Sequence, residues 1–200
     1  MDFAFIRPKK MHRRHLFLSA LFSIYMFAYM VTLTYIDLGN TGVSAFSWQL
    51  TLHYIDQAVT AAAFLAFALL CRICRDEKGR IRLLGMANLA YTISVIALYF
   101  TQSALAYSIL AILAAFSLGV LGGMVYACMA LALPQISGIG KIMAIGASAA
   151  VVLQYVLQEH LDLMFGIPVM LSLAFSATLW LAVNKPWGGW EDAGLPSDKM

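Results

Sequence analysis

The chain has 200 residues, of which 62% are hydrophobic and only 12% charged, and its mean hydropathy is +0.81. A soluble domain is only about half apolar, so this composition excludes a water-soluble globular protein. The net charge of +3 gives no reason to expect a nucleic-acid partner, because the basic residues all fit a membrane topology.

Six apolar runs are long enough to cross a bilayer as helices. A hydrocarbon core of about 30 Å needs roughly 20 residues at about 1.5 Å each, and an open strand would leave backbone groups unpaired in lipid. The runs between charged segments are 16–36, 48–70, 83–101, 104–133, 142–158 and 164–183. We therefore predict an all-α membrane protein with a basic N-terminal segment 1–15, a six-helix domain 16–183 and a tail 184–200.

The positions of the cations predict the orientation. All 13 Lys and Arg residues lie before the first run, between the second and third, between the fourth and fifth, or after the sixth. None occurs at 37–47, 102–103 or 159–163. This is the positive-inside pattern, so we expect both termini in the cytoplasm and the chain in the inner (plasma) membrane of the cell, with the lipid bilayer as its surroundings.

The first run follows a basic segment, as the apolar part of a signal peptide does. It is too long for that role and has a poor cleavage pattern, so we interpret it as a retained helix. Tyr25 and Tyr29 lie one turn apart on this helix and are candidates for lining a cavity.

The second run carries the strongest polar signal. His53, Asp56 and Gln57 fall on one broad helical face in its outer half, and Asp56 is the only acid more than one turn inside a predicted span. An ionisable group in hydrocarbon costs several kcal/mol unless it faces a cavity or a partner. We predict that Asp56, hydrogen-bonded by His53, lines a crevice open to the outside that binds a proton or a cationic solute. The competing interpretation is that both groups are hydrated at the interface.

The segment 72–82, RICRDEKGRIR, joins the second and third runs. Its Asp76, Gly79 and Arg80 resemble the signature loop of the major facilitator superfamily, which also joins helices two and three on the cytoplasmic face. Arg72 stands where that family has a glycine, and two further basic positions are not kept.

The resemblance implies that the six helices form one half of a twelve-helix transporter, with the solute path between two halves and helices two and five facing it. The fifth run adds Gln154 and Gln158, one turn apart. We therefore expect a cavity lined by the first, second and fifth helices. The partner would be a second copy of the chain or a separately encoded half.

The fourth run carries a packing signal. Its small residues recur at every fourth position, as Ala115, Gly119, Gly123 and Ala127. Such a stripe lets another helix approach closely. The fifth helix, which has a shorter stripe, and another chain are the two candidate partners.

No residue pattern indicates catalysis, a metal or a cofactor. Cys71 and Cys74 match half of a zinc site, but no second pair accompanies them, and Glu159, His160 and Asp162 fall in a short outer loop. We predict a half-size transporter of a small solute that works by alternating access, with a truncated gene product as one explanation of its size. The alternative is a membrane sensor or scaffold that transports nothing. The substrate and the coupling ion are not encoded in any motif.

Overall fold

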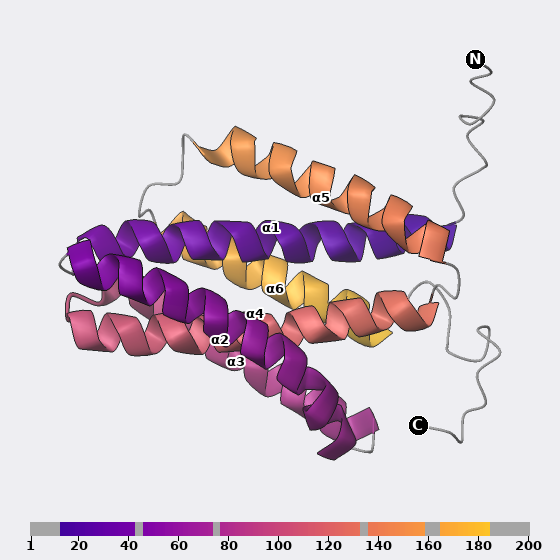
Figure 1. Cartoon of the computed structure of the whole chain (residues 1–200), viewed down its shortest axis with the longest axis horizontal. Coiled ribbons are helices and arrows are strands. Elements are labelled where there is room, and N and C mark those ends of the chain that lie inside the picture. The colour runs from indigo at the N-terminus through magenta and orange to yellow at the C-terminus, as the bar shows by residue number, and fades with distance from the viewer. Residues whose placement is uncertain (1–12, 43–45, 74–76, 133–135, 159–164, 185–200) are drawn as a thin grey trace.

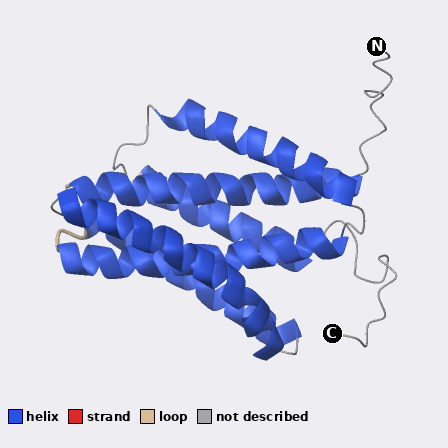
Figure 2. Ribbon diagram, in the orientation of Figure 1, coloured by secondary structure: helices blue, strands red, loops and turns tan. Residues whose placement is uncertain are grey.

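The structure is a computed structural model that describes residues 13–42, 46–73, 77–132, 136–158 and 165–184. Within these ranges every regular element is a helix (Figures 1 and 2). The helices are α1 (Arg13–Thr41), α2 (Phe46–Ile73), α3 (Glu77–Phe100), α4 (Ala104–Ala132), α5 (Ile136–Gln158) and α6 (Gly166–Asn184). Each has the length and apolar composition of a membrane span, which confirms the six predicted spans.

Three helices extend by at least five residues beyond one end of the apolar runs that predicted them. α1 continues through Asp37 to Thr41, α3 begins at Glu77, and α5 begins at Ile136. In all three, the helix keeps backbone groups paired where the chain leaves hydrocarbon, and in α3 the added residues include Lys and Arg, which are good helix formers. The expectation of a loop at 72–82 is therefore wrong for its whole described part, since 72–73 end α2 and 77–82, with Gly79 and Arg80, begin α3.

Two helices form the centre of the bundle. α4 packs against α2 and α3, α1 packs against α5 and α6, and α1 and α4 also contact each other. α3 and α6 pack together across the bundle. If α1 is exchanged with α4, α2 with α5 and α3 with α6, the same helix pairs result. The packing is therefore symmetric between the first three helices and the last three. Because successive helices run in opposite directions, the two groups of three have inverted orientations in the membrane (Figure 1).

The predicted small-residue stripe on α4 allows close helix approach, and the helix that it contacts is α2. A Cβ added at Gly119 would collide with the backbone carbonyl oxygen of Thr60, and one at Gly123 would collide with the side chain of Phe67. α5 packs against α1 instead, where a Cβ at Gly146 would come within 2.8 Å of Phe22. Residue spacing identifies the small face of a helix but not the helix that will occupy it.

Polar and aromatic side chains join α3 to α6. The rings of Tyr91 and Phe175 stack with centroids 4.2 Å apart and planes 19° apart. Ser176 donates a hydrogen bond of 3.1 Å to Asn88 Oδ1, and the Tyr91 hydroxyl is hydrogen-bonded to that of Thr32 on α1. We call Asn88, Tyr91, Phe175 and Ser176 the α3–α6 seam. Asn88 and Ser176 bond each other and Tyr91 bonds Thr32 of α1, so these polar groups have partners in their apolar surroundings.

Candidate binding groove

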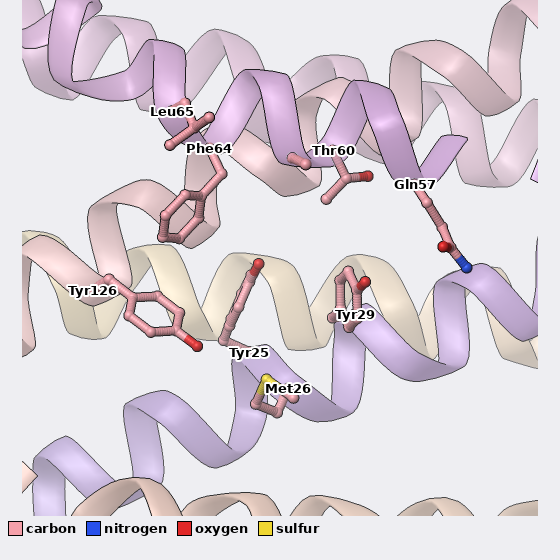
Figure 3. A pocket seen from close by; sticks show the side chains of 9 residues that line it. Tyr25, Met26, Tyr29, Gln57, Thr60, Phe64, Leu65 and Tyr126 are labelled. Carbon is pink, nitrogen blue, oxygen red and sulfur yellow. The ribbon is translucent and has the colours of Figure 1, made fainter. Parts of the chain in front are cut away.

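A groove of about 510 Å³ opens between α1 and α2, and α4 contributes to its wall. Figure 3 shows the side chains of the two helices facing each other across it. Nine residues line the groove: Tyr25, Met26, Tyr29, Gln57, Thr60, Ala61, Phe64, Leu65 and Tyr126. Three of the predicted site residues, Tyr25, Tyr29 and Gln57, are therefore brought together.

Aromatic rings make up much of the wall. Tyr25 and Tyr29 lie with ring centroids 6.3 Å apart, and Phe64 meets Tyr126 edge to face at 5.1 Å. The Tyr25 hydroxyl is next to Gly122, where any side chain would collide with it. Glycine on α4 therefore makes room for a ring of the groove.

A chain of hydrogen bonds extends from the groove toward the end where α1 meets α2. The amide nitrogen of Gln57 lies 2.7 Å from His53 Nε2, and His53 Nδ1 lies 2.9 Å from Asp37 Oδ2. With the Gln57 amide as donor, Nε2 accepts, so the ring proton is on Nδ1 and is donated to Asp37. These bonds join Asp37 of α1 to Gln57 of α2 through His53.

The structure contradicts the predicted hydrogen bond between His53 and Asp56. Asp56 is 1% exposed, and neither of its carboxylate oxygens has a hydrogen-bond partner among the described residues. It shares the buried stripe of α2 with Thr60, whose hydroxyl bonds the backbone oxygens of Asp56 at 2.8 Å and Ala115 at 3.2 Å. Asp56 thus lies on the side of α2 that packs on α4, whereas His53 turns toward α1. Asp56 does not line the groove.

The helical extension of α1 explains why the sequence analysis did not identify Asp37 as the partner of His53. The sequence interpretation ended the first span at residue 36, which left Asp37 in a loop. Asp37 is in fact on the last turns of the helix, three steps of four residues after Tyr25 and two after Tyr29. Continuing that spacing by one turn past the apolar run would have found it. Tyr126 and Phe64 gave no comparable signal, since single aromatic residues in apolar helices are ordinary packing groups.

The groove does not include the wall that was predicted on α5. α1 lies between α5 and α2 in Figure 1, and no α5 residue lines the groove. Gln154 is half-buried, the adjacent Tyr155 is 76% exposed, and the side chain of Gln158 is outside the described residues. α4 takes the place that was predicted for α5, because α2 packs along its small-residue stripe.

Two other sets of residues named in the sequence analysis lie wholly or partly outside the residues that the structure describes. Asp76 of the signature segment is not described, nor are Glu159, His160 and Asp162. Within the described ranges, no three His, Cys, Asp or Glu side chains are grouped so that they would hold a metal ion. Searches for similarity found no matching family model, curated protein or solved structure.

Proposed function

We propose that this chain is a six-helix carrier unit that moves a small solute across the membrane by rocking against a second six-helix unit. The observation that carries the proposal is the groove between α1 and α2. It combines a volume of about 510 Å³ with aromatic walls and a hydrogen-bonded polar end. Binding sites for small molecules are typically concave, largely apolar and provided with a few placed polar groups.

The helix arrangement supports a carrier of the major-facilitator type. In that family each six-helix half contains two groups of three helices with inverted orientation. Here, too, exchanging α1–α3 with α4–α6 preserves the main helix pairs, as expected for two inverted groups of three helices. This packing pattern is independent of the three matching residues of the signature segment, so it adds separate support.

The charge distribution supports the orientation of the carrier. The described basic side chains Lys78, Arg80, Arg82 and Lys141 lie in the first turns of α3 and α5, at the end of the bundle where α1 begins. By the positive-inside rule this end is cytoplasmic, so the Asp37–His53 end of the groove faces outward. The multi-pass chain would lie in the inner (plasma) membrane of the cell.

Cysteine labelling tests this orientation. With Cys71, Cys74 and Cys128 replaced, Leu38→Cys should react with a membrane-impermeant maleimide added outside, and Lys78→Cys should react only after permeabilisation. Labelling of Lys78→Cys from outside would contradict the topology.

The second unit is proposed to be another copy of the chain. Gln57 is exposed, and His53 and Tyr29 are partly exposed along the groove. A polar group turned to hydrocarbon without a partner costs about 1 to 3 kcal/mol. A twofold dimer would cover the same face of both copies, as is usual in homo-oligomers, and would enclose water beside these groups.

Native mass spectrometry and disulfide trapping would test the dimer. Cysteines at Gln57 and Gln154, on the two helices that flank α1, should crosslink between copies. A cysteine at Trp180, exposed on α6, is the control and should not. A monomer that transports and gives no crosslink at either position would refute the dimer.

Transport itself is tested in proteoliposomes loaded with a panel of neutral, anionic and cationic small solutes. We expect at least one solute to leave faster than from protein-free liposomes, and an imposed proton gradient will show whether its flux is proton-coupled. Gln57→Leu should reduce that flux, whereas Gln102→Leu, exposed between α3 and α4, should preserve it. If no solute moves while the dimer forms, the non-transporting sensor or scaffold becomes the better explanation.

A further inference from the structure

The charges around the groove restrict the kind of ligand that it can accept. At its polar end, Gln57 is hydrogen-bonded to His53, and His53 is hydrogen-bonded to the acid Asp37. The lining residues include no Lys or Arg, and the described Lys and Arg side chains lie at the opposite end of the bundle. An anion would therefore meet no counter-charge in the groove.

The aromatic wall favours a positive charge as well. Four of the nine lining residues are Tyr or Phe, contributed by α1, α2 and α4. The face of an aromatic ring attracts a cation within about 6 Å, and the attraction is larger where water is excluded. Tyr25 is 4% exposed, and Tyr29 lies beside it on the same wall, between Tyr25 and the Gln57 end (Figure 3).

The rest of the wall is apolar. Met26, Ala61 and Leu65 offer no ionisable group, and Thr60 directs its hydroxyl to backbone oxygens. A small inorganic cation would find no set of oxygen ligands here, since the lining contains no carboxylate. The volume instead suits an organic molecule, because ligand pockets span about 300 to 1,000 Å³.

From this combination we propose that the groove binds an amphipathic organic cation, with the positive group near Tyr29 and Gln57 and the apolar body near Phe64 and Leu65. This inference rests on the proposed carrier function, whose solute it assigns to a chemical class. The aromatic rings attract the cation directly, and Asp37, two hydrogen bonds away from Gln57, supplies an acid beside that end of the groove.

Two large ions of nearly the same shape and opposite charge provide the test. The full chain is placed in phosphatidylcholine nanodiscs, which carry no net lipid charge, and binding of radiolabelled tetraphenylphosphonium is measured against protein-free discs. We expect saturable binding of this cation. Tetraphenylborate, the isosteric anion, should compete at least tenfold less well after correction for its partition into lipid.

Matched variants locate the site. Tyr29→Leu should weaken binding about tenfold, which corresponds to about 1.4 kcal/mol. Tyr29→Phe keeps the ring and should bind nearly as well, which separates loss of the site from loss of the fold. Tyr155→Leu removes an exposed tyrosine from α5 and should leave binding unchanged. Asp37→Asn should weaken binding several-fold, whereas Asp37→Glu should preserve most of it.

The outcomes separate this inference from the carrier proposal. Competition by tetraphenylborate as strong as by the cation, or equal losses in Tyr29→Leu and Tyr155→Leu, would overturn the cation site. Transport of a neutral or anionic solute by a protein that does not bind tetraphenylphosphonium would also overturn it, while leaving the carrier intact. Specific binding of the cation without any flux would support the site and refute the carrier.

Discussion

The α3–α6 seam and the groove between α1 and α2 handle polar side chains in opposite ways. In the seam, Asn88 pairs with Ser176, and the stacked rings of Tyr91 and Phe175 close the space around them. On the groove side, Gln57 remains exposed and Asp56 is buried without a hydrogen-bond partner among the described residues. Buried polar side chains that are hydrogen-bonded to each other stabilise a fold. Polar side chains that are exposed to lipid or buried without a partner lower its stability, and in membrane helices such residues are candidates for a functional role.

The largest loss of stability is expected from a substitution that disrupts the α3–α6 seam. Phe175→Ala removes a fully buried ring that stacks on Tyr91, and loss of a buried phenyl group costs about 3 to 5 kcal/mol in protein cores. Unfolding in mixed detergent micelles should show a loss of this size. At a temperature where the variant is folded, cation binding should be unchanged. Weakened binding by folded protein would show that the seam and the groove are coupled.

A second substitution tests the contact that forms the groove wall. Gly119→Ala places a methyl group against the Thr60 carbonyl and should destabilise the fold by about 1 to 3 kcal/mol as α2 is displaced. Gly85→Ala is the control, since nothing lies within 4 Å of its added methyl group. There the helix should gain about 0.5 to 1 kcal/mol. Effects of the same sign at both positions would contradict the close packing of α2 on α4.

A substitution at Asp56 tests whether this buried acid has a structural or a functional role. Asp56→Asn removes the ionisable group at nearly constant size, so the unfolding free energy should rise by about 1 kcal/mol. Solute flux and cation binding should be unchanged, because Asp56 does not line the groove. A marked loss of stability would show instead that the carboxyl group has a structural partner.

The smallest expected effect concerns a single hydrogen bond of the seam. Ser176→Ala removes the donor to Asn88 and should cost about 0.6 kcal/mol, a typical value for polar contacts between membrane helices. Equilibrium unfolding measures it, and flux should not change. A loss of several kcal/mol would mean that the seam depends on a wider polar network.

Much of the architecture was predictable from local pattern. Apolar runs gave the six helices, and the spacing of Ala115, Gly119, Gly123 and Ala127 correctly marked a face for close packing. Part of the groove was also predictable, since Tyr25, Tyr29 and Gln57 line it as proposed. These successes share one cause, which is that helix length and helical spacing depend on residues near in sequence.

The missed parts depend on which helix lies beside which. His53 was expected to bond Asp56, three residues away on its own helix, but it bonds Asp37 of α1. α5 was expected in the cavity wall, yet α4 supplies Tyr126 there. Residue spacing along one helix does not show which residues of other helices will contact it. In addition, ending a predicted span at the first charged residue underestimates how far the helix continues.

The sequence by itself determined an all-helical protein with six spans, the concentration of basic residues between alternate spans, and the polar and aromatic residues available to a site. The tertiary structure decided that α1, α2 and α4 form the groove, that Asp37 rather than Asp56 holds His53, and that Asp56 is buried away from it. The physical reason is that hydrophobic length and charge act on each segment separately. Partner choice arises from the fit of small and large side chains between helices, such as Gly119 against Thr60, which exists only once the bundle has assembled.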